Sequence, residues 1–344
     1  MKKLLTDVRW LGRQLPGTVT SRLVPFNISL GYARRHGRIY LRRYGIPQHV
    51  IDNLRSTFPD MDDERIEEIA RLHIEFCKRL DLHDALTRQL EVRKRWWTVN
   101  GREHLDSSLA LGRGALLVSA HFGHVRLIST ALRTYGYEPR LVRMMGVNWS
   151  ERNQRWHEKL SSGNSFRRSL FKNLIADPRE LQDIRADIDI RPILSALSSN
   201  QPVIVLGDGL RSSEFVGLPL LGKTYPFPVG FMKIARLTKA PVLPAFAVEA
   251  GPTFGVHVEI QPPLPIDPSL GVAANMEKFS ASLDERLRLT PHQWHRWSTV
   301  NVFENADEWS RSDARWHNSF TKWCAERGPR EPRTIDQLER SAKA

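Results

Sequence analysis

Cysteine is scarce in this chain: Cys77 and Cys324 are the only two thiols among 344 residues. Two cysteines this far apart favour neither a disulfide framework nor a cysteine-based metal site, and they fit a reducing compartment. His121 and His124 would need further ligands to hold a metal, and the sequence indicates none. We therefore predict no metal and no other cofactor.

Long apolar runs are also missing. No stretch approaches the roughly 18 to 20 apolar residues that a membrane-spanning helix needs. Near the N-terminus, Asp7, Arg9 and Arg13 interrupt the apolar core that a signal peptide would require, so we expect no export. Any attachment to a membrane must then be peripheral. Internal repeats and long linkers are absent as well, and nothing forces a division into separately folded domains.

Acidic residues are outnumbered, with 38 Asp and Glu against 51 Lys and Arg, which gives a net charge of +13. Such a charge predicts attraction to nucleic acid, to anionic lipid or to an acidic carrier protein. The basic residues are spread along the chain, and none of their runs resembles a nucleic-acid-binding motif. We therefore expect no nucleic-acid partner.

One basic segment, residues 26–44, has a spacing that suits a membrane surface. Arg34, Arg38 and Arg42 recur at every fourth residue and would align along one helical face, with apolar residues interleaved. Gly31 and Gly37 weaken the helix itself. Contact with anionic head groups and an ordinary solvated face are both open for this segment.

The periodicity of the sequence predicts an α/β fold with a helical N-terminal region. Apolar residues within 62–80 recur at helical spacing after an acidic first turn. From Gly114 onward, short apolar runs alternate with helical stretches, which is typical of a mixed, mostly parallel central sheet flanked by helices. We predict strands at 115–119, 139–144, 202–206 and 241–248, an edge or half-buried strand at 254–261, and helices at 125–135, 229–237 and within 148–200.

Two polar residues come directly after predicted strands. His121 follows the strand 115–119 and Asp208 follows the strand 202–206, so both would lie where parallel sheets bind ligands. His121, beside the small Gly123, is placed to act as a general base, although a packed structural histidine is the commoner interpretation. Asp208 lies between Gly207 and Gly209, which fits a tight turn and also a close approach to a ligand.

Two further segments could contact a substrate. Arg211 could clamp a phosphate through its guanidinium group. The apolar residues 215–221 would line a groove for an acyl chain or form a buried loop, and the sequence alone does not choose between these two interpretations.

Several segments, taken in order, resemble the lipid A biosynthesis acyltransferases, a branch of the lysophospholipid acyltransferase superfamily. The first are Asn53-Leu54-Arg55, Phe58-Pro59, Trp96-Trp97 and Gly112 to Leu117 leading into His121-Phe122-Gly123. They are followed by Gly207-Asp208-Gly209, Phe215 to Gly222, Pro228-Val229-Gly230, Ile234-Ala235-Arg236 and Ala240 to Pro244. The last is Pro291-His292-Gln293-Trp294 with Trp297. The resemblance covers most of the chain.

This resemblance implies a histidine followed, after four intervening residues, by a catalytic Asp or Glu. In this chain Arg126 takes the place of the acid, so no carboxylate in the motif fixes the tautomer of His121. Three alternatives remain: another acid such as Asp208 reaches His121 in space, the phosphate of the substrate contributes, or the chain is a degenerate lipid- or carrier-binding protein with the same fold.

The function implied by the resemblance is transfer of a fatty acyl chain from an acyl carrier protein or acyl-CoA thioester to a hydroxyl of an anionic lipid, such as a lipid A precursor. The expected location is peripheral, on the cytoplasmic face of the bacterial inner membrane. The expected parts are a helical membrane-associating region in 1–100, an acyltransferase domain in 101–300 and a helical extension in 301–344. His121 is the candidate base, and the candidate binding residues are Phe122, Gly123, Arg126, Asp208, Gly209 and Arg211.

Overall fold

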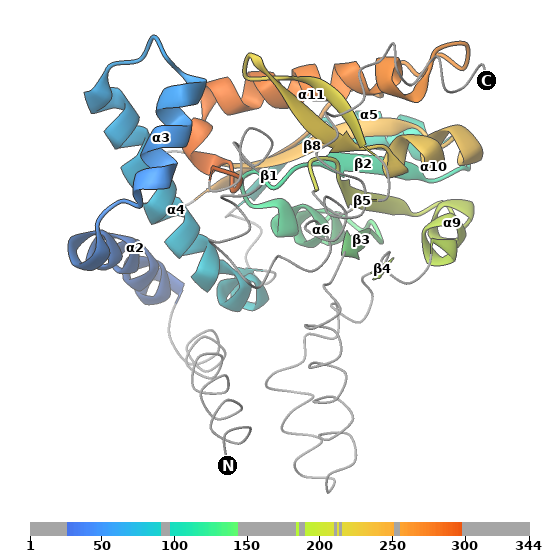
Figure 1. The fold of residues 1–344 in the computed structure, drawn as a ribbon. Coiled ribbons are helices and arrows are strands. Elements are labelled where there is room, and N and C mark those ends of the chain that lie inside the picture. The colour runs from blue at the N-terminus through green and yellow to red at the C-terminus, as the bar shows by residue number, and fades with distance from the viewer. Residues whose placement is uncertain are drawn as a thin grey trace, which may run out of the picture.

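The structure is a computed structural model that describes residues 26–90, 97–143, 184–185, 190–209, 212, 215–250 and 255–297. The extension predicted for 301–344 and most of the helices predicted within 148–200 lie outside the described residues. Within the described part, helices cover a central sheet and a group of N-terminal helices packs at one end of it (Figure 1). The α/β fold with a helical N-terminal region is therefore confirmed.

Within the described residues, the N-terminal region contains the three helices α2 (Phe26–Tyr44), α3 (Gln48–Thr57) and α4 (Asp63–Leu90). The Asp62 carboxylate accepts a hydrogen bond from the backbone N–H of Arg65 at 2.7 Å, which caps the start of α4. Gly37 lets α2 and α4 cross closely, because a Cβ at this position would lie 2.9 Å from the Cα of Glu75. Gly37 is thus a packing position between two helices.

A seven-stranded sheet forms the centre of the fold, in the order β1-β9-β8-β2-β5-β3-β4. The pairing of β8 with β9 is antiparallel and the other pairings are parallel. The strands are β1 (Trp97–Asn100), β2 (Ala115–Ser119), β3 (Arg140–Arg143), β4 (Ile184–Arg185), β5 (Pro202–Leu206), β8 (Val242–Glu249) and β9 (Val256–Ile260).

Alternating side chains of the central strands enter two separate cores. Leu116 and Val118 of β2 pack in the core that includes α9 (Arg191–Ser198), α10 (Gly230–Thr238) and α11 (Val272–Leu289). Leu117 packs on the opposite face with α5 (Arg102–Leu109) and α6 (Val125–Arg133). The sheet is therefore the middle of three layers, with α11 above it and α6 below it in Figure 1.

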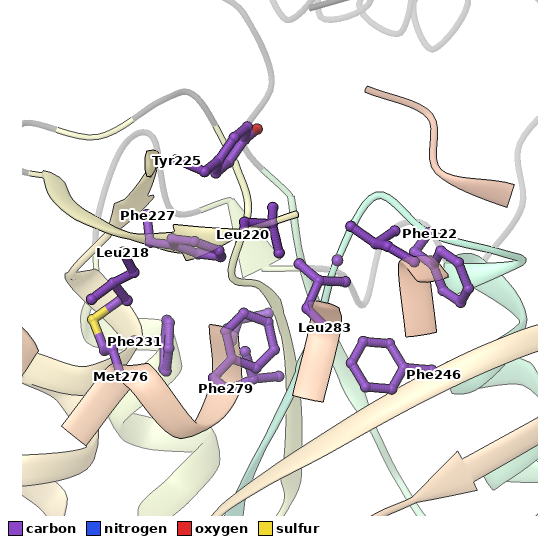
Figure 2. Packing of buried hydrophobic residues seen from close by; sticks show 14 of the residues in the cluster. Phe122, Leu218, Leu220, Tyr225, Phe227, Phe231, Phe246, Met276, Phe279 and Leu283 are labelled. Atoms are coloured by element: carbon purple, nitrogen blue, oxygen red, sulfur yellow. The ribbon is translucent and has the colours of Figure 1, made fainter. Parts of the chain in front are cut away.

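The segment 215–221 belongs to a hairpin. Strand β6 (Phe215–Leu220) pairs antiparallel with β7 (Lys223–Pro228), and this hairpin packs on α11. Figure 2 shows the hairpin side chains Leu218, Leu220 and Phe227 in one apolar cluster with Phe279 of α11. Leu218 and Phe227 are completely buried, so the segment is a core strand rather than a buried loop.

The structure differs from the predicted elements at two short strands, β1 and β4, and decides between the two alternatives for β9. Residues 97–100 are a strand although the N-terminal hundred residues were predicted helical, because Trp97 and Val99 bury one face of β1 against the sheet. Of the two alternatives for β9, the half-buried strand is confirmed, since β1 pairs with it on one side and β8 on the other. The two-residue β4 is also a strand within the region predicted to be helical.

Candidate active site

The register of the sheet places His121 beside Asp208. Strands β2 and β5 are parallel neighbours in which Ser119 pairs with Leu206, and each polar residue comes two positions after its strand ends. The His121 Nδ1 lies 2.7 Å from the Asp208 Oδ1. The carboxyl ends of the two strands thus bring the imidazole and the carboxylate together, as their positions in the sequence predicted.

The Asp208 carboxylate is completely buried and has several hydrogen-bond donors. The backbone N–H of His121 donates to its two oxygens at 2.8 and 3.0 Å, and the Trp294 Nε1–H donates to Oδ2 at 3.3 Å. Burial alone would raise the pKa of Asp208, but the nearby His121 and Arg296 together hold it well below its ordinary value. Asp208 is therefore ionised at neutral pH.

An ionised carboxylate only accepts hydrogen bonds, so the Nδ1 of His121 carries the proton, and this N–H donates a hydrogen bond to Asp208. The Nε2 of the same ring then has the free lone pair. The His121 side chain is 27 % exposed, whereas Asp208 is 0 % exposed. Burial and Arg296 lower the pKa of His121, against the raising effect of Asp208. The ring is a neutral base oriented by a carboxylate, with part of its surface open to solvent.

Arg296 is the cation next to this ring. Its Nη2 lies 3.0 Å from Nδ1 and 3.2 Å from Nε2 of His121. A position nearly equidistant from both ring nitrogens lies over the face of the ring, because in the ring plane the carbon between the nitrogens would block it. Arg296 is only 7 % exposed. The lone pair of Nε2 lies in the ring plane and therefore does not point toward a group over the ring face.

A short loop after β2 holds His121 in place. Gly123 has a positive φ of 57°, and a Cβ there would lie 2.0 Å from the carbonyl oxygen of Ala247. This close approach lets the His124 N–H donate to that oxygen at 2.7 Å, while the Gly123 N–H donates to the Gln293 carbonyl oxygen at 2.9 Å. Only glycine fits this position without displacing β8.

A second pair of a histidine and a carboxylate is buried next to the loop that follows β2. The His124 Nε2 is 3.1 Å from Glu249 Oε2, and Glu249 also forms an ion pair with Arg79 of α4 at 3.2 Å. The backbone N–H of Glu249 donates to the side chain of Gln293 at 2.9 Å. This network ties α4 and the end of β8 to the loop that carries His121.

The family of the chain follows from a comparison with known proteins. The family model described as bacterial lipid A biosynthesis acyltransferase matches residues 3–298. The chain belongs to this family. A search of curated proteins gave no match. Membership of the lipid A acyltransferase family implies acyltransferase activity, and the histidine with an orienting carboxylate is the chemistry that acyl transfer to a hydroxyl requires.

Relative to the motif expected in lipid A acyltransferases, the acid beside the histidine comes from a different place. Arg126 is exposed in the first turn of α6, whereas Asp208 on the neighbouring strand end contacts His121. Among the three alternatives to the missing acid, this geometry matches the one in which Asp208 reaches the ring.

The other residues predicted for the site lie at varied depths. Phe122 is completely buried, and its ring packs edge-on against Phe246 with centroids 6.0 Å apart. Gly209 follows Asp208 and is partly exposed, and a Cβ there would make only an ordinary contact of 3.8 Å with the Leu206 carbonyl oxygen. Arg211 lies outside the described residues. The predicted substrate contacts of Phe122, Gly123, Arg126, Gly209 and Arg211 stay predictions.

Three side chains that complete the site were not predicted to belong to it: Trp294, Arg296 and Glu249. Trp294 and Arg296 lie within the segment from Pro291 to Trp297, which reaches the site from the far end of the described chain. The available signal was an arginine between Trp294 and Trp297, in a motif already noted for its resemblance to the family. Among the described residues, no group of three histidine, cysteine or acidic side chains is placed to bind a metal ion.

Proposed function

We propose that the chain transfers a fatty acyl group from an acyl carrier protein or acyl-CoA thioester to a hydroxyl of an anionic glycolipid of the lipid A precursor type. The observation that carries the proposal is the contact of the partly exposed His121 ring with the buried Asp208 carboxylate. A family member that retained only binding would have no need for an imidazole oriented by a desolvated carboxylate. The same contact therefore argues against the alternative of a degenerate binding protein.

The proposed reaction uses Nε2 of His121 as the general base. The acceptor hydroxyl gives its proton to Nε2 as its oxygen bonds to the thioester carbonyl carbon, and the carbonyl π electrons move to oxygen. The resulting oxyanion collapses, the carbon–sulfur bond breaks, and the leaving thiolate takes the proton from Nε2. Asp208 keeps the ring in the required tautomer and stabilises its protonated form during the step.

We propose further that the protein acts while bound peripherally to the cytoplasmic face of the inner membrane. Ile28 and Ile39 of α2 are 62 % and 47 % exposed, and their spacing places them on the same helical face as Arg35 and Arg42. Exposed apolar side chains between cations suit a surface of anionic lipid. None of the helices in the described ranges is long and apolar enough to cross a membrane.

The test of catalysis uses purified full-length protein, labelled acyl carrier protein and acyl-CoA thioesters, and a lipid A precursor or phospholipid acceptor. We expect transfer to the lipid A precursor, and a loss on the order of 10⁴-fold in His121→Ala, since both base and orienting pair are removed. His257→Ala, which removes an exposed histidine of β9, is the matched control and should retain full transfer. Equal, background-level transfer by the wild type and His121→Ala would refute the proposal.

The membrane proposal has a separate test. Wild-type protein should sediment with vesicles that contain phosphatidylglycerol and remain in solution with vesicles of phosphatidylcholine alone. Replacing Arg35 and Arg42 by Gln should weaken the first interaction by roughly 2 kcal/mol in total, since each cation near an anionic surface contributes about 1 kcal/mol. Sedimentation that is the same for both vesicle types would contradict the electrostatic part of this proposal.

A further inference from the structure

The position of Arg296 goes beyond what an orienting pair needs. Asp208 alone fixes the tautomer of His121, yet a second ionised group, the guanidinium of Arg296, packs on the ring face within 3.2 Å of Nε2. Arg296 lies in the segment after the 3₁₀ turn η3 (Pro291–Gln293), between the completely buried Trp294 and Trp297. A cation with 7 % exposure next to a catalytic base calls for a chemical explanation.

The site has an unmet chemical requirement, which is stabilisation of the oxyanion. Backbone N–H groups beside the base often fill this role. Here the N–H of Gly123 already donates to Gln293, and the N–H of His124 already donates to Ala247. The N–H of His121 donates to Asp208. The amides of His121, Gly123 and His124 are therefore engaged within the protein, which favours a side-chain donor near the ring for the reacting carbonyl.

The geometry points to Arg296 as that donor. When a hydroxyl that is hydrogen-bonded to Nε2 attacks, the thioester carbonyl carbon must lie next to the hydroxyl oxygen. A guanidinium that contacts the same Nε2 from the ring face is then a neighbour of the carbonyl oxygen. Guanidinium N–H groups bind oxyanions strongly, and their charge strengthens the bond in a desolvated site.

We propose that Arg296 is a catalytic residue of the acyl transfer, donating hydrogen bonds to the tetrahedral oxyanion while its contact with the imidazole holds the ring in its plane. This inference rests on the proposed function and names a second residue of the same reaction. As the hydroxyl proton moves to Nε2, one positive charge forms on His121 and one negative charge forms on the carbonyl oxygen. Asp208 offsets the first and Arg296 offsets the second, and both charges vanish when the thiolate leaves with the proton.

The charged and titratable groups around the ring give this proposal a pH signature. They are Asp208 after β5, Arg296 and His295 after η3, with the Tyr225 hydroxyl of β7 donating to the Asp208 carbonyl oxygen at 3.3 Å. Burial holds the pKa of His295 at about 3, so it is neutral near pH 7. Besides burial, Arg296 lowers the pKa of His121. Removing Arg296 must therefore move the protonation of His121 to higher pH.

The experiment compares Arg296→Met and Arg296→Lys with the wild type in the acyl-transfer assay across pH. In Arg296→Met we expect kcat to fall on the order of 10²- to 10³-fold, as for loss of one oxyanion donor, with KM nearly unchanged. The acidic limb of kcat/KM should also shift to higher pH. Arg296→Lys should restore the position of that limb and only part of kcat, because a lysine keeps the charge without the planar donors.

A purely structural role would lower the folded fraction without moving the acidic limb, and this result would overturn the proposal. Thermal unfolding separates the two cases, and Arg296→Gln replaces the methionine variant if the latter does not fold. An NMR titration of the His121 ring in ¹⁵N-histidine-labelled protein gives the same shift without any substrate. If Arg296→Met keeps the wild-type kcat and pH profile while His121→Ala is inactive, only the role of Arg296 is refuted. If His121→Ala keeps wild-type transfer, the proposed function fails instead.

Discussion

His121 and His124 lie three residues apart, and each contacts a carboxylate from a neighbouring strand of the same sheet. The His121–Asp208 contact is 2.7 Å and the His124–Glu249 contact is 3.1 Å, so the two pairs are chemically alike. They differ in access and in neighbours. The His121 side chain is 27 % exposed and His124 is 1 % exposed, and the second pair is further joined to Arg79 of α4.

This difference separates a pair available to a substrate from a pair that holds the structure together. A base must reach solvent or substrate to exchange a proton, which His124 cannot do from the interior. The inner pair, His124 with Glu249, instead connects α4, β8 and the loop that carries His121. A histidine next to a carboxylate is therefore not sufficient to identify a base, and exposure of the ring decides between the two roles.

The largest expected effect comes from breaking the outer pair, His121 with Asp208, by the substitution Asp208→Asn. Asparagine keeps the shape but also offers an N–H₂ group, which favours the wrong tautomer of His121. By analogy with the same change in serine proteases, transfer should fall on the order of 10⁴-fold. Rate measurements on protein of verified thermal stability test this. A folded Asp208→Asn protein with more than a tenth of wild-type transfer would show that Asp208 does not orient the base.

Breaking the inner pair with Glu249→Gln should reduce stability far more than activity. Removing one partner of a buried ion pair costs about 3–5 kcal/mol, because the other charge, here Arg79, stays buried. Although burial would raise the pKa of Glu249, His124 and Arg79 lower it. The carboxylate therefore contributes stability above its unfolded pKa of about 4.3, and this contribution disappears as pH falls through its lower folded pKa.

Urea unfolding at pH 7 and near pH 3.5 measures this effect. The stability difference between the wild type and Glu249→Gln should be large at pH 7 and smaller at the acidic pH. Glu259→Gln is the matched control, because its ion pair with Arg286 is partly exposed and should contribute less than about 1 kcal/mol. Acyl transfer per folded molecule of Glu249→Gln should stay within tenfold of wild type. A loss of activity as large as that of Asp208→Asn, without a loss of stability, would reverse the roles assigned to the two pairs.

The outer pair was predictable from the sequence because it depends on local rules. Ala115–Ser119 and Pro202–Leu206 are short apolar runs with the bounds that the structure shows, and parallel neighbours present their carboxyl ends at one edge. His121 and Asp208 follow these runs at equal distance. The strand bounds and residue positions placed both side chains at one edge of the sheet, and the pairing of β2 with β5, which the sequence did not predict, brings them into contact.

Arg296 was not predictable in this way because its contact with His121 spans 175 residues of sequence. It arrives in a segment with no regular secondary structure, positioned by tertiary packing. The Asn53 side chain hydrogen-bonds to the Trp297 carbonyl oxygen, and the Trp297 ring packs against Trp294 with centroids 5.1 Å apart. Strand β1 was not predicted for a similar reason. Its four residues show little periodicity, and its partner strand β9 is far away in the sequence.

The smallest expected effect comes from restoring the acid of the family motif with Arg126→Glu. If Asp208 already orients His121, a second carboxylate on the exposed first turn of α6 does not change the orientation or the tautomer of the ring. Surface substitutions usually change free energies by within about 0.5 kcal/mol, which corresponds to a factor of about two in rate. Transfer by Arg126→Glu should therefore match the wild type within that factor, whereas a larger loss would assign to Arg126 the substrate contact predicted from the sequence. The decisive comparison is the double variant Asp208→Asn with Arg126→Glu, which should be as inactive as Asp208→Asn alone. Recovery of transfer in the double variant would mean that position 126 reaches the ring and that the outer pair is one of two ways to orient this base.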